Sequence, residues 1–111
     1  MHQVNSIKAD FLLNFLSDAL SKKCITSIHI ALYIGIYRNY CVNSQANPFF
    51  ITRRGMMAIA KIKSKATYHK CISDLIREGY ITYEPSYNPF TGSTVTLISL
   101  RNYAMIKDEE K

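Results

Sequence analysis

The basic side chains of this chain gather in one short segment, where they could hold a negatively charged partner. The segment from Arg53 to Arg77 contains seven of the 14 lysines and arginines, and Asp74 is its one acidic residue. It therefore carries the whole formal net charge of +6, and the rest of the chain is neutral. Such a concentration favours a polyanion over plain solvation of scattered charges. The basic residues are Arg53, Arg54, Lys61, Lys63, Lys65, Lys70 and Arg77.

Residues 64–79 are predicted to form a helix with two different faces. Ser64 is a typical N-cap residue, and Gly79 is typical of the position just after a helix. The apolar face, which would dock on the body, consists of Tyr68, Ile72, Leu75 and Ile76, with Cys71 at its edge. The other face is short-chained or basic, as a helix entering the major groove of DNA must be, and the free amides near Ser64 favour a phosphate. This face comprises Lys65, Ala66, His69, Lys70, Ser73 and Arg77.

The sequence does not group the residue types that catalysis, zinc binding or single-strand binding would need. There is no G-x-S-x-G motif, no phosphate loop and no pair of carboxylates in an apolar setting, and Asp10 and Asp18 fall on the polar side of a predicted helix. His69 and Cys71 would need two further ligands to hold zinc. The eight tyrosines are scattered, which argues against a single-strand stacking platform. We expect no enzyme activity, no metal, no cofactor and no small-molecule ligand.

Two helices are expected ahead of the basic segment. The first should run from Asn5 or Ser6 to about Lys22, with an apolar face that includes Leu20. Phe11 and Leu13 are expected to project away from that face. The second should begin at Thr26 or Ser27 and end near Cys41, and it is apolar on nearly all sides, which predicts burial on more than one side.

A short extended piece and a hairpin complete the expected elements. The extended piece covers residues 49–51, and Thr52 caps a helix that a tight turn joins to the one at Ser64. Strands over residues 80–84 and 94–100 flank a run of turn-forming residues. This order predicts a mainly helical fold with a small antiparallel sheet of two or three strands.

Composition and cysteine usage indicate one globular domain in a reducing compartment. The chain is 48% hydrophobic and 20% charged. Cys24, Cys41 and Cys71 are odd in number and dispersed, so we expect buried free thiols and a cytoplasmic protein. The first ten residues do not read as a signal peptide, and the apolar run at residues 28–37 is too short to span a bilayer, so no membrane association is expected.

The segment TRRGMMAIAKIKSKATYHKCISDLIREGYITYEP resembles the winged helix-turn-helix superfamily of bacterial DNA-binding proteins. The resemblance covers about residues 26–100, which leaves residues 1–25 as an N-terminal helix for packing or dimerisation and 101–111 as a C-terminal tail. The phrase GYITYEPSYNPFTGSTV is similar to small proteins encoded near plasmid and transposon genes, described as regulators or as parts of replication or excision machinery. The matching positions are Ser64, Thr67, Tyr68, Ile72, Leu75, Gly79 and Ile81.

The resemblance implies roles for individual residues. Lys65, Ala66, His69 and Lys70 fall where base contacts are made, and Thr67, Arg53 and Arg54 fall where backbone contacts are common. Tyr68 is expected in the core rather than against a base. The wing tip departs from the pattern because it carries no Arg or Lys, and its remaining donors to phosphates are Tyr87, Asn88, Thr91 and Ser93.

The sequence thus predicts sequence-specific binding of double-stranded DNA, with transcription control as the main expectation. Two alternatives stay open: an accessory factor for mobile-element excision or plasmid replication, and a winged-helix module that contacts protein. A homodimer built through the first two helices is also expected, because a single small module has a limited footprint on DNA.

Overall fold

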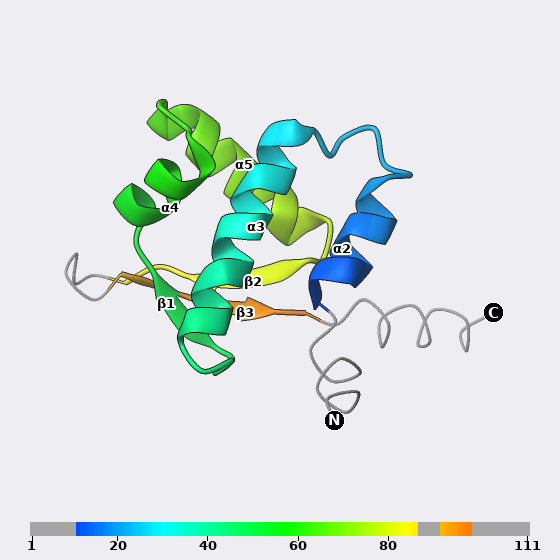
Figure 1. Cartoon of the computed structure of the whole chain (residues 1–111). Coiled ribbons are helices and arrows are strands. Elements are labelled where there is room, and N and C mark those ends of the chain that lie inside the picture. The colour runs from blue at the N-terminus through cyan, green and yellow to red at the C-terminus, as the bar shows by residue number, and fades with distance from the viewer. Residues whose placement is uncertain (1–10, 87–91, 99–111) are drawn as a thin grey trace, which may run out of the picture.

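A computed structural model describes residues 11–86 and 92–98, and within these ranges the chain folds into four helices and one antiparallel sheet (Figure 1). The prediction of a helix-rich chain with a small antiparallel sheet is confirmed. In chain order the elements are α2 Phe11–Ala19, α3 Ser27–Val42, β1 Phe49–Ile51, α4 Arg53–Ala60, α5 Lys65–Arg77, β2 Ile81–Glu84 and β3 Ser93–Leu97.

The starts of α3, α4 and α5 lie where the sequence places them, and those of α4 and α5 are each fixed by a side-chain hydrogen bond to the backbone. The Thr52 hydroxyl accepts from the Gly55 amide at 3.0 Å, and the Ser64 hydroxyl accepts from the Thr67 amide at 3.2 Å. Thr26 is the N-cap of α3. After α5, Gly79 turns the chain with a φ of +85°, a conformation that glycine adopts without strain.

The sheet has three strands in the order β1-β3-β2, so the strand latest in the chain is central. Phe49 pairs with Val95 on one side of β3, and Tyr83 pairs with Val95 on the other. Side chains alternate between the two faces of the sheet, and Phe50 lies on the outer one. The inner face is buried under the helices and comprises Phe49, Ile51, Ile81, Val95 and Leu97.

Helix α3 lies at the centre of the helical layer, between α2 and α4 in Figure 1. Leu32, Tyr33 and Ile36 on this helix are all at most 1% exposed. The Tyr33 ring stacks on Phe15 of α2 at 3.9 Å between ring centroids, and Phe15 meets Tyr80 edge-on at 4.8 Å. This aromatic contact fixes α2 against α3 and the start of β2.

A polar cluster fixes α2 at a second point, the turn between α5 and β2. The Tyr80 hydroxyl donates to Asp18 Oδ2 at 2.5 Å, and the Lys22 ammonium lies 3.0 Å from both Asp18 and Glu78. Burial raises the pKa of Tyr80 to about 12, and its hydrogen bond to Asp18 adds to the increase. Burial lowers the pKa of Lys22, but its hydrogen bonds to Asp18 and Glu78 raise it more, so the net shift is upward. The C-terminal end of α5 is therefore tied to α2.

Several expectations for the apolar residues were wrong. Helix α2 ends at Ala19 rather than Lys22, so Leu20 lies beyond the helix and is 87% exposed. Phe11 packs edge-on against Tyr40 at 5.4 Å instead of projecting away, whereas Leu13 is exposed as expected. Ile76 is 40% exposed because it lies at the margin of the α5 apolar stripe. The expected start of the first helix lies outside the described residues.

The cysteine prediction was only partly right. Cys71 is buried on the inner side of α5, but Cys24 and Cys41 are exposed, since they lie in the connection before α3 and in its last turn. Tyr68 is fully buried in the core, as expected.

Candidate nucleic-acid interface

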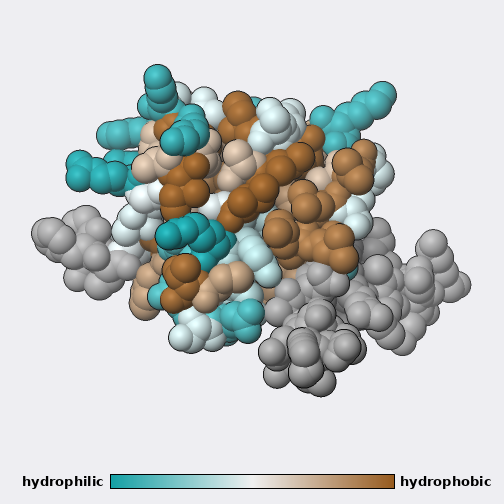
Figure 2. Space-filling model, in the orientation of Figure 1, coloured by the Kyte–Doolittle hydropathy of each residue, from teal (hydrophilic) through white to brown (hydrophobic). Residues whose placement is uncertain are grey.

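A tight turn holds α4 and α5 together at one end of the molecule. Lys61 adopts the left-handed conformation with a φ of +63°, and the Ile62 amide donates to the Met57 carbonyl at 2.9 Å. The Ile62 side chain is buried, while Lys61 and Lys63 on either side of it are exposed. The turn thus presents two cations to solvent next to the first residue of α5. Figure 2 shows long hydrophilic side chains projecting from this end of the molecule.

Nearly all of the described residues predicted to contact DNA lie at the surface. Thr67 and Ser93 are the exceptions among them, since both are half-buried. The Thr67 amide donates to the Ser64 hydroxyl, and the Ser93 hydroxyl donates to that of Tyr83. The exposed members are Arg53, Arg54, Lys61, Lys63, Ser64, Lys65, Ala66, His69, Lys70 and Ser73. Tyr87, Asn88 and Thr91 lie outside the described residues, so the contacts expected of them stay predictions.

The outward side of α5 is a narrow ridge. Ala66 and Ser73 are exposed and small, and at 3.6 residues per turn they lie nearly above each other on the helix surface. His69 lies on the flank of this ridge that faces the sheet, and Lys70 lies on the flank that faces α3. The ridge therefore has an imidazole on one side and an ammonium on the other.

On the sheet side, the ridge is bordered by an open groove of about 380 Å³, which we call the sheet-side groove. It runs between the first turn of α4 and the β2–β3 hairpin. Ser93 donates to the Tyr83 hydroxyl at 2.9 Å across the hairpin. The polar residues that line the sheet-side groove include Arg53, Arg54, His69, Tyr83, Ser86 and Ser93.

Gly92 sets the width of this groove. A Cβ atom at Gly92 would lie 2.3 Å from the Ile51 carbonyl oxygen, and the residue has a φ of +80°. Only glycine allows the hairpin backbone to approach the end of β1 so closely. This close approach places the hairpin beside the first turn of α4.

Asp74 is a buried anion beneath the opposite flank of α5. Its side chain is 5% exposed, and its Oδ2 atom accepts from His29 Nε2 at 2.7 Å and from Lys70 Nζ at 3.3 Å. Its Oδ1 atom accepts from Arg77 Nη1 at 2.8 Å. His29 Nδ1 accepts from the Thr26 amide at 3.0 Å, so the Nε2 atom carries the proton given to Asp74.

The partners of Asp74 keep it ionised. The hydrogen bond from His29 lowers the pKa of Asp74 most, and burial acts in the opposite direction. The hydrogen bonds from Lys70 and Arg77 lower the pKa further, to about 2. The carboxylate in turn raises the pKa of Arg77. The one acid of the basic segment is thus a charge that draws Lys70 and Arg77 to the α3 side of α5.

The sequence reasoning missed Lys23 and left Arg77 out of the predicted site. Lys23 is exposed in the connection before α3, and together with Lys70 and Arg77 it lines a groove on the α3 flank of α5. No local pattern marks Lys23, because its position beside α5 depends on how α2 and α3 pack. Arg77 was predicted on the polar face of its helix, and its contact with Asp74 is visible at an i, i+3 spacing.

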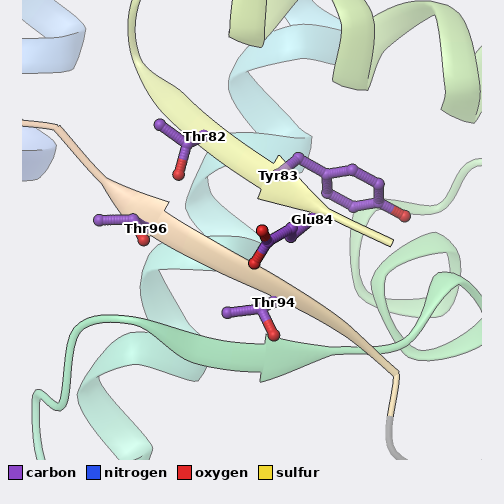
Figure 3. Close-up of a pocket in the computed structure, with 5 residues that line it drawn as sticks. All are labelled: Thr82, Tyr83, Glu84, Thr94 and Thr96. Carbon is purple, nitrogen blue, oxygen red and sulfur yellow. The ribbon is translucent and has the colours of Figure 1, made fainter. Parts of the chain in front are cut away.

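Another hollow lies on the outer face of the sheet and is a poor fit for a polyanion. Its lining supplies threonine hydroxyls and the Glu84 carboxylate, with no cation. Figure 3 shows Thr82 and Glu84 from β2 and Thr94 and Thr96 from β3, with the Tyr83 ring directed away from them. The lining residues are Thr82, Tyr83, Glu84, Thr94 and Thr96.

Within residues 11–86 and 92–98, no three or more His, Cys, Asp or Glu side chains group together in a way that would hold a metal ion. In the same part of the chain, no helix has the length and apolar character needed to cross a membrane.

Comparison with protein-family models, with curated proteins and with solved structures gave no match for this chain.

Proposed function

We propose that the chain is a winged helix-turn-helix protein that binds double-stranded DNA sequence-specifically, in the cytoplasm and without catalysing a reaction. In this proposal α4 and α5 form the helix-turn-helix, α5 enters the major groove, and the β2–β3 hairpin is the wing. The order of α3, β1, α4, α5 and the hairpin supports the fold. Base edges would be read from the α5 ridge while surrounding cations hold phosphates.

The observation that carries this proposal is the combination of a slim ridge with cations around it. Helix α5 is 10–12 Å across with its side chains, and the major groove is about 12 Å wide, so the helix fits only if its outward residues are small. Ala66 and Ser73 meet that requirement. Lys65 and His69 lie close enough to the ridge to reach base edges, and Arg53 and Arg54 lie where they would meet the flanking backbone.

The direct test is selection of bound duplexes from a random pool, followed by a salt titration on the enriched motif. Contacts with about five phosphates predict that log K falls with log salt at a slope of roughly −4 to −5. No enrichment, together with a slope near zero on an unselected duplex, would refute DNA binding and favour the protein-interaction alternative.

Single substitutions separate reading from positioning. Lys65→Ala or His69→Ala should relax the preference at one base pair, at a cost of about 1–3 kcal/mol there. Arg53→Ala should weaken binding to all duplexes alike. Arg38→Ala is the matched control, because Arg38 is an exposed cation on α3 outside the basic segment. A changed motif with Arg53→Ala and an unchanged one with Lys65→Ala would mean that the wrong helix was assigned to the groove.

The biological role we propose is transcription control. The alternative, an accessory role in mobile-element excision or plasmid replication, uses the same DNA contacts. A motif upstream of coding sequences supports the first role, and a motif confined to element ends or replication origins supports the second.

We also propose a homodimer through an apolar surface on α2 and α3. On α3, Ala31 and Ile34 lie one turn apart on the same outward side, and Ile34 is 43% exposed. Leu13 of α2 is 57% exposed. Figure 2 shows an apolar band across this side of the molecule. Contiguous apolar surface of this kind on a soluble protein marks an interaction site.

The dimer is tested by sedimentation equilibrium. Ile34→Glu should convert a dimer to the 12.7 kDa monomer. Phe50→Glu is the matched control, because Phe50 is an exposed apolar residue on the outer sheet face. A wild-type chain that stays monomeric across the micromolar range would exclude the dimer. Loss of the dimer with Phe50→Glu alone would move the interface to the sheet.

A further inference from the structure

The α3 flank of α5 carries a groove that the proposed function has not used. The groove has a volume of about 380 Å³ and lies between α5 and the start of α3. Apolar groups and two thiols, Cys24 and Cys71, contribute to its walls, and the buried His29–Asp74 pair lies at one side. We call it the α3-side groove. Its cations are Lys23, Lys70 and Arg77.

The α3-side groove has an excess of positive charge. Asp74 is its one carboxylate, and its contacts with Lys70 and Arg77 neutralise one of the three cations. Lys23 makes no ion pair with any described residue. The side chains of Lys70 and Arg77 are 76% and 59% exposed, so both can contact an anion while Asp74 holds their position. Arg77 also pairs with Glu78 at 3.4 Å, so the full positive charge of Lys23 is what remains for a ligand.

The two grooves lie on the two flanks of one helix. His69 lines the sheet-side groove, whereas Lys70, Asp74 and Arg77 line the α3-side groove. Ala66 and Ser73 of the ridge lie between them. The two phosphate backbones that border a major groove are about 12 Å apart, and a helix with side chains is 10–12 Å across. A duplex that accepts the α5 ridge therefore brings one backbone to each flank.

We propose that the α3-side groove binds the phosphodiester backbone of the second DNA strand, with Lys23 as its unneutralised cation. This inference rests on the proposed function, since it requires α5 in the major groove. It extends the interface from the basic segment to the connection before α3. Asp74 acts as a positioning residue here, because it holds Lys70 and Arg77 on this flank without contacting DNA.

The native thiols allow a test on the unaltered chain. Cys24 is exposed and lines the α3-side groove, Cys41 is exposed near the other end of α3, and Cys71 is buried. The sixteen-residue helix α3 is about 24 Å long, so Cys41 is far from the groove. Each thiol's rate of alkylation by N-ethylmaleimide is measured by mass spectrometry, with and without the selected duplex. A gel-shift assay on the same samples reports binding.

The expected result is selective protection of Cys24. With duplex at about ten times Kd, mass action predicts alkylation roughly tenfold slower at Cys24, while Cys41 keeps its rate. An unprotected Cys24 in a sample that shifts on the gel would overturn this inference and leave the proposed function standing. A sample that binds no duplex would refute the proposed function itself. Equal protection of both thiols would show that the effect is not local to the groove and would also overturn the inference.

Two further arms identify the anion. Inorganic phosphate alone, at matched ionic strength, should not protect Cys24; protection by it would assign the groove to a small free anion and overturn the DNA assignment. Lys23→Ala should make the salt slope about one unit shallower and leave the selected motif unchanged. Arg38→Ala serves as the control for loss of one exposed cation. A salt slope unchanged by Lys23→Ala would remove Lys23 from the contact and contradict the proposal.

Discussion

Replacing Tyr68 with phenylalanine is expected to stabilise the protein, although it removes a polar group from the core. The Tyr68 side chain is 0% exposed, and its hydroxyl has no hydrogen-bond partner among the described residues. A buried hydroxyl without a partner costs about 1–3 kcal/mol relative to water. Tyr68→Phe removes that cost and leaves the ring in place. We expect the free energy of unfolding to rise by about 1 kcal/mol.

Tyr80→Phe is the matched control, because it makes the same chemical change at an equally buried ring. Tyr80 is 1% exposed, but its hydroxyl donates to the Asp18 carboxylate. A hydrogen bond to a charged group contributes about 1.5–3 kcal/mol, so this variant should be destabilised by that amount. The two substitutions are therefore expected to have opposite signs.

Urea denaturation of the wild type and both variants measures these changes, with calorimetry as a second readout. A change of 1 kcal/mol corresponds to roughly 4 °C in Tm for a domain of this size. A destabilised Tyr68→Phe variant would show that the hydroxyl has a partner or that its packing outweighs its desolvation. Equal effects of both variants would refute the assignment of the Tyr80–Asp18 hydrogen bond as a stabilising contact.

Three further outcomes are expected from the geometry. Since the folded-state pKa of Asp74 is lowered to about 2, its contribution to stability is complete above about pH 4 and is lost as the pH falls toward 2. Asp74→Asn should therefore remove this loss of stability between about pH 4 and pH 2, as measured by denaturation curves recorded across that pH range. Gly92→Ala should lower the free energy of unfolding by well over 1 kcal/mol in urea denaturation, because the new Cβ would meet the Ile51 carbonyl. Gly79 has a similar positive φ but open space around it, so Gly79→Ala should lower it by only about 1 kcal/mol. Equal losses in the two variants would contradict this account. Ser64→Ala should cost about 1 kcal/mol through loss of the α5 cap, while Ser27→Ala, one residue inside α3, should be nearly neutral by the same measurement.

The features predicted well from the sequence are those fixed by neighbours a few residues apart. The starts of α4 and α5 are marked by Thr52 and Ser64, and the end of α5 is followed by Gly79. Each of these residues acts through contacts within one turn, so its residue type alone is informative. The fully buried Tyr68 follows from the spacing of the apolar stripe on its own helix. The exposure of Lys65 and His69 follows from the opposite face of that same helix.

The features that escaped prediction depend on residues far apart in the chain. Asp74 was noted as the one acid of the basic segment, but its burial comes from His29, which lies 45 positions earlier. Phe11 is covered because it meets Tyr40 on another helix. Lys23 joins the surface beside α5 only after α2 and α3 have packed. Helical periodicity describes one element at a time and carries no information on these pairings.

The order β1-β3-β2 has a consequence for how the chain is made. β3 supplies the partners of both other strands, so neither β1 nor β2 can enter this sheet until β3 has been synthesised. Ile51 of β1 pairs with Ser93 of β3, so its strand partner is absent until residues 52–92 have been synthesised. Translation that stops before β3 leaves two strands with exposed apolar faces and unpaired backbone edges. We therefore expect fragments that end before Ser93 to be cleared by proteolysis or to aggregate, rather than to persist as partly active domains.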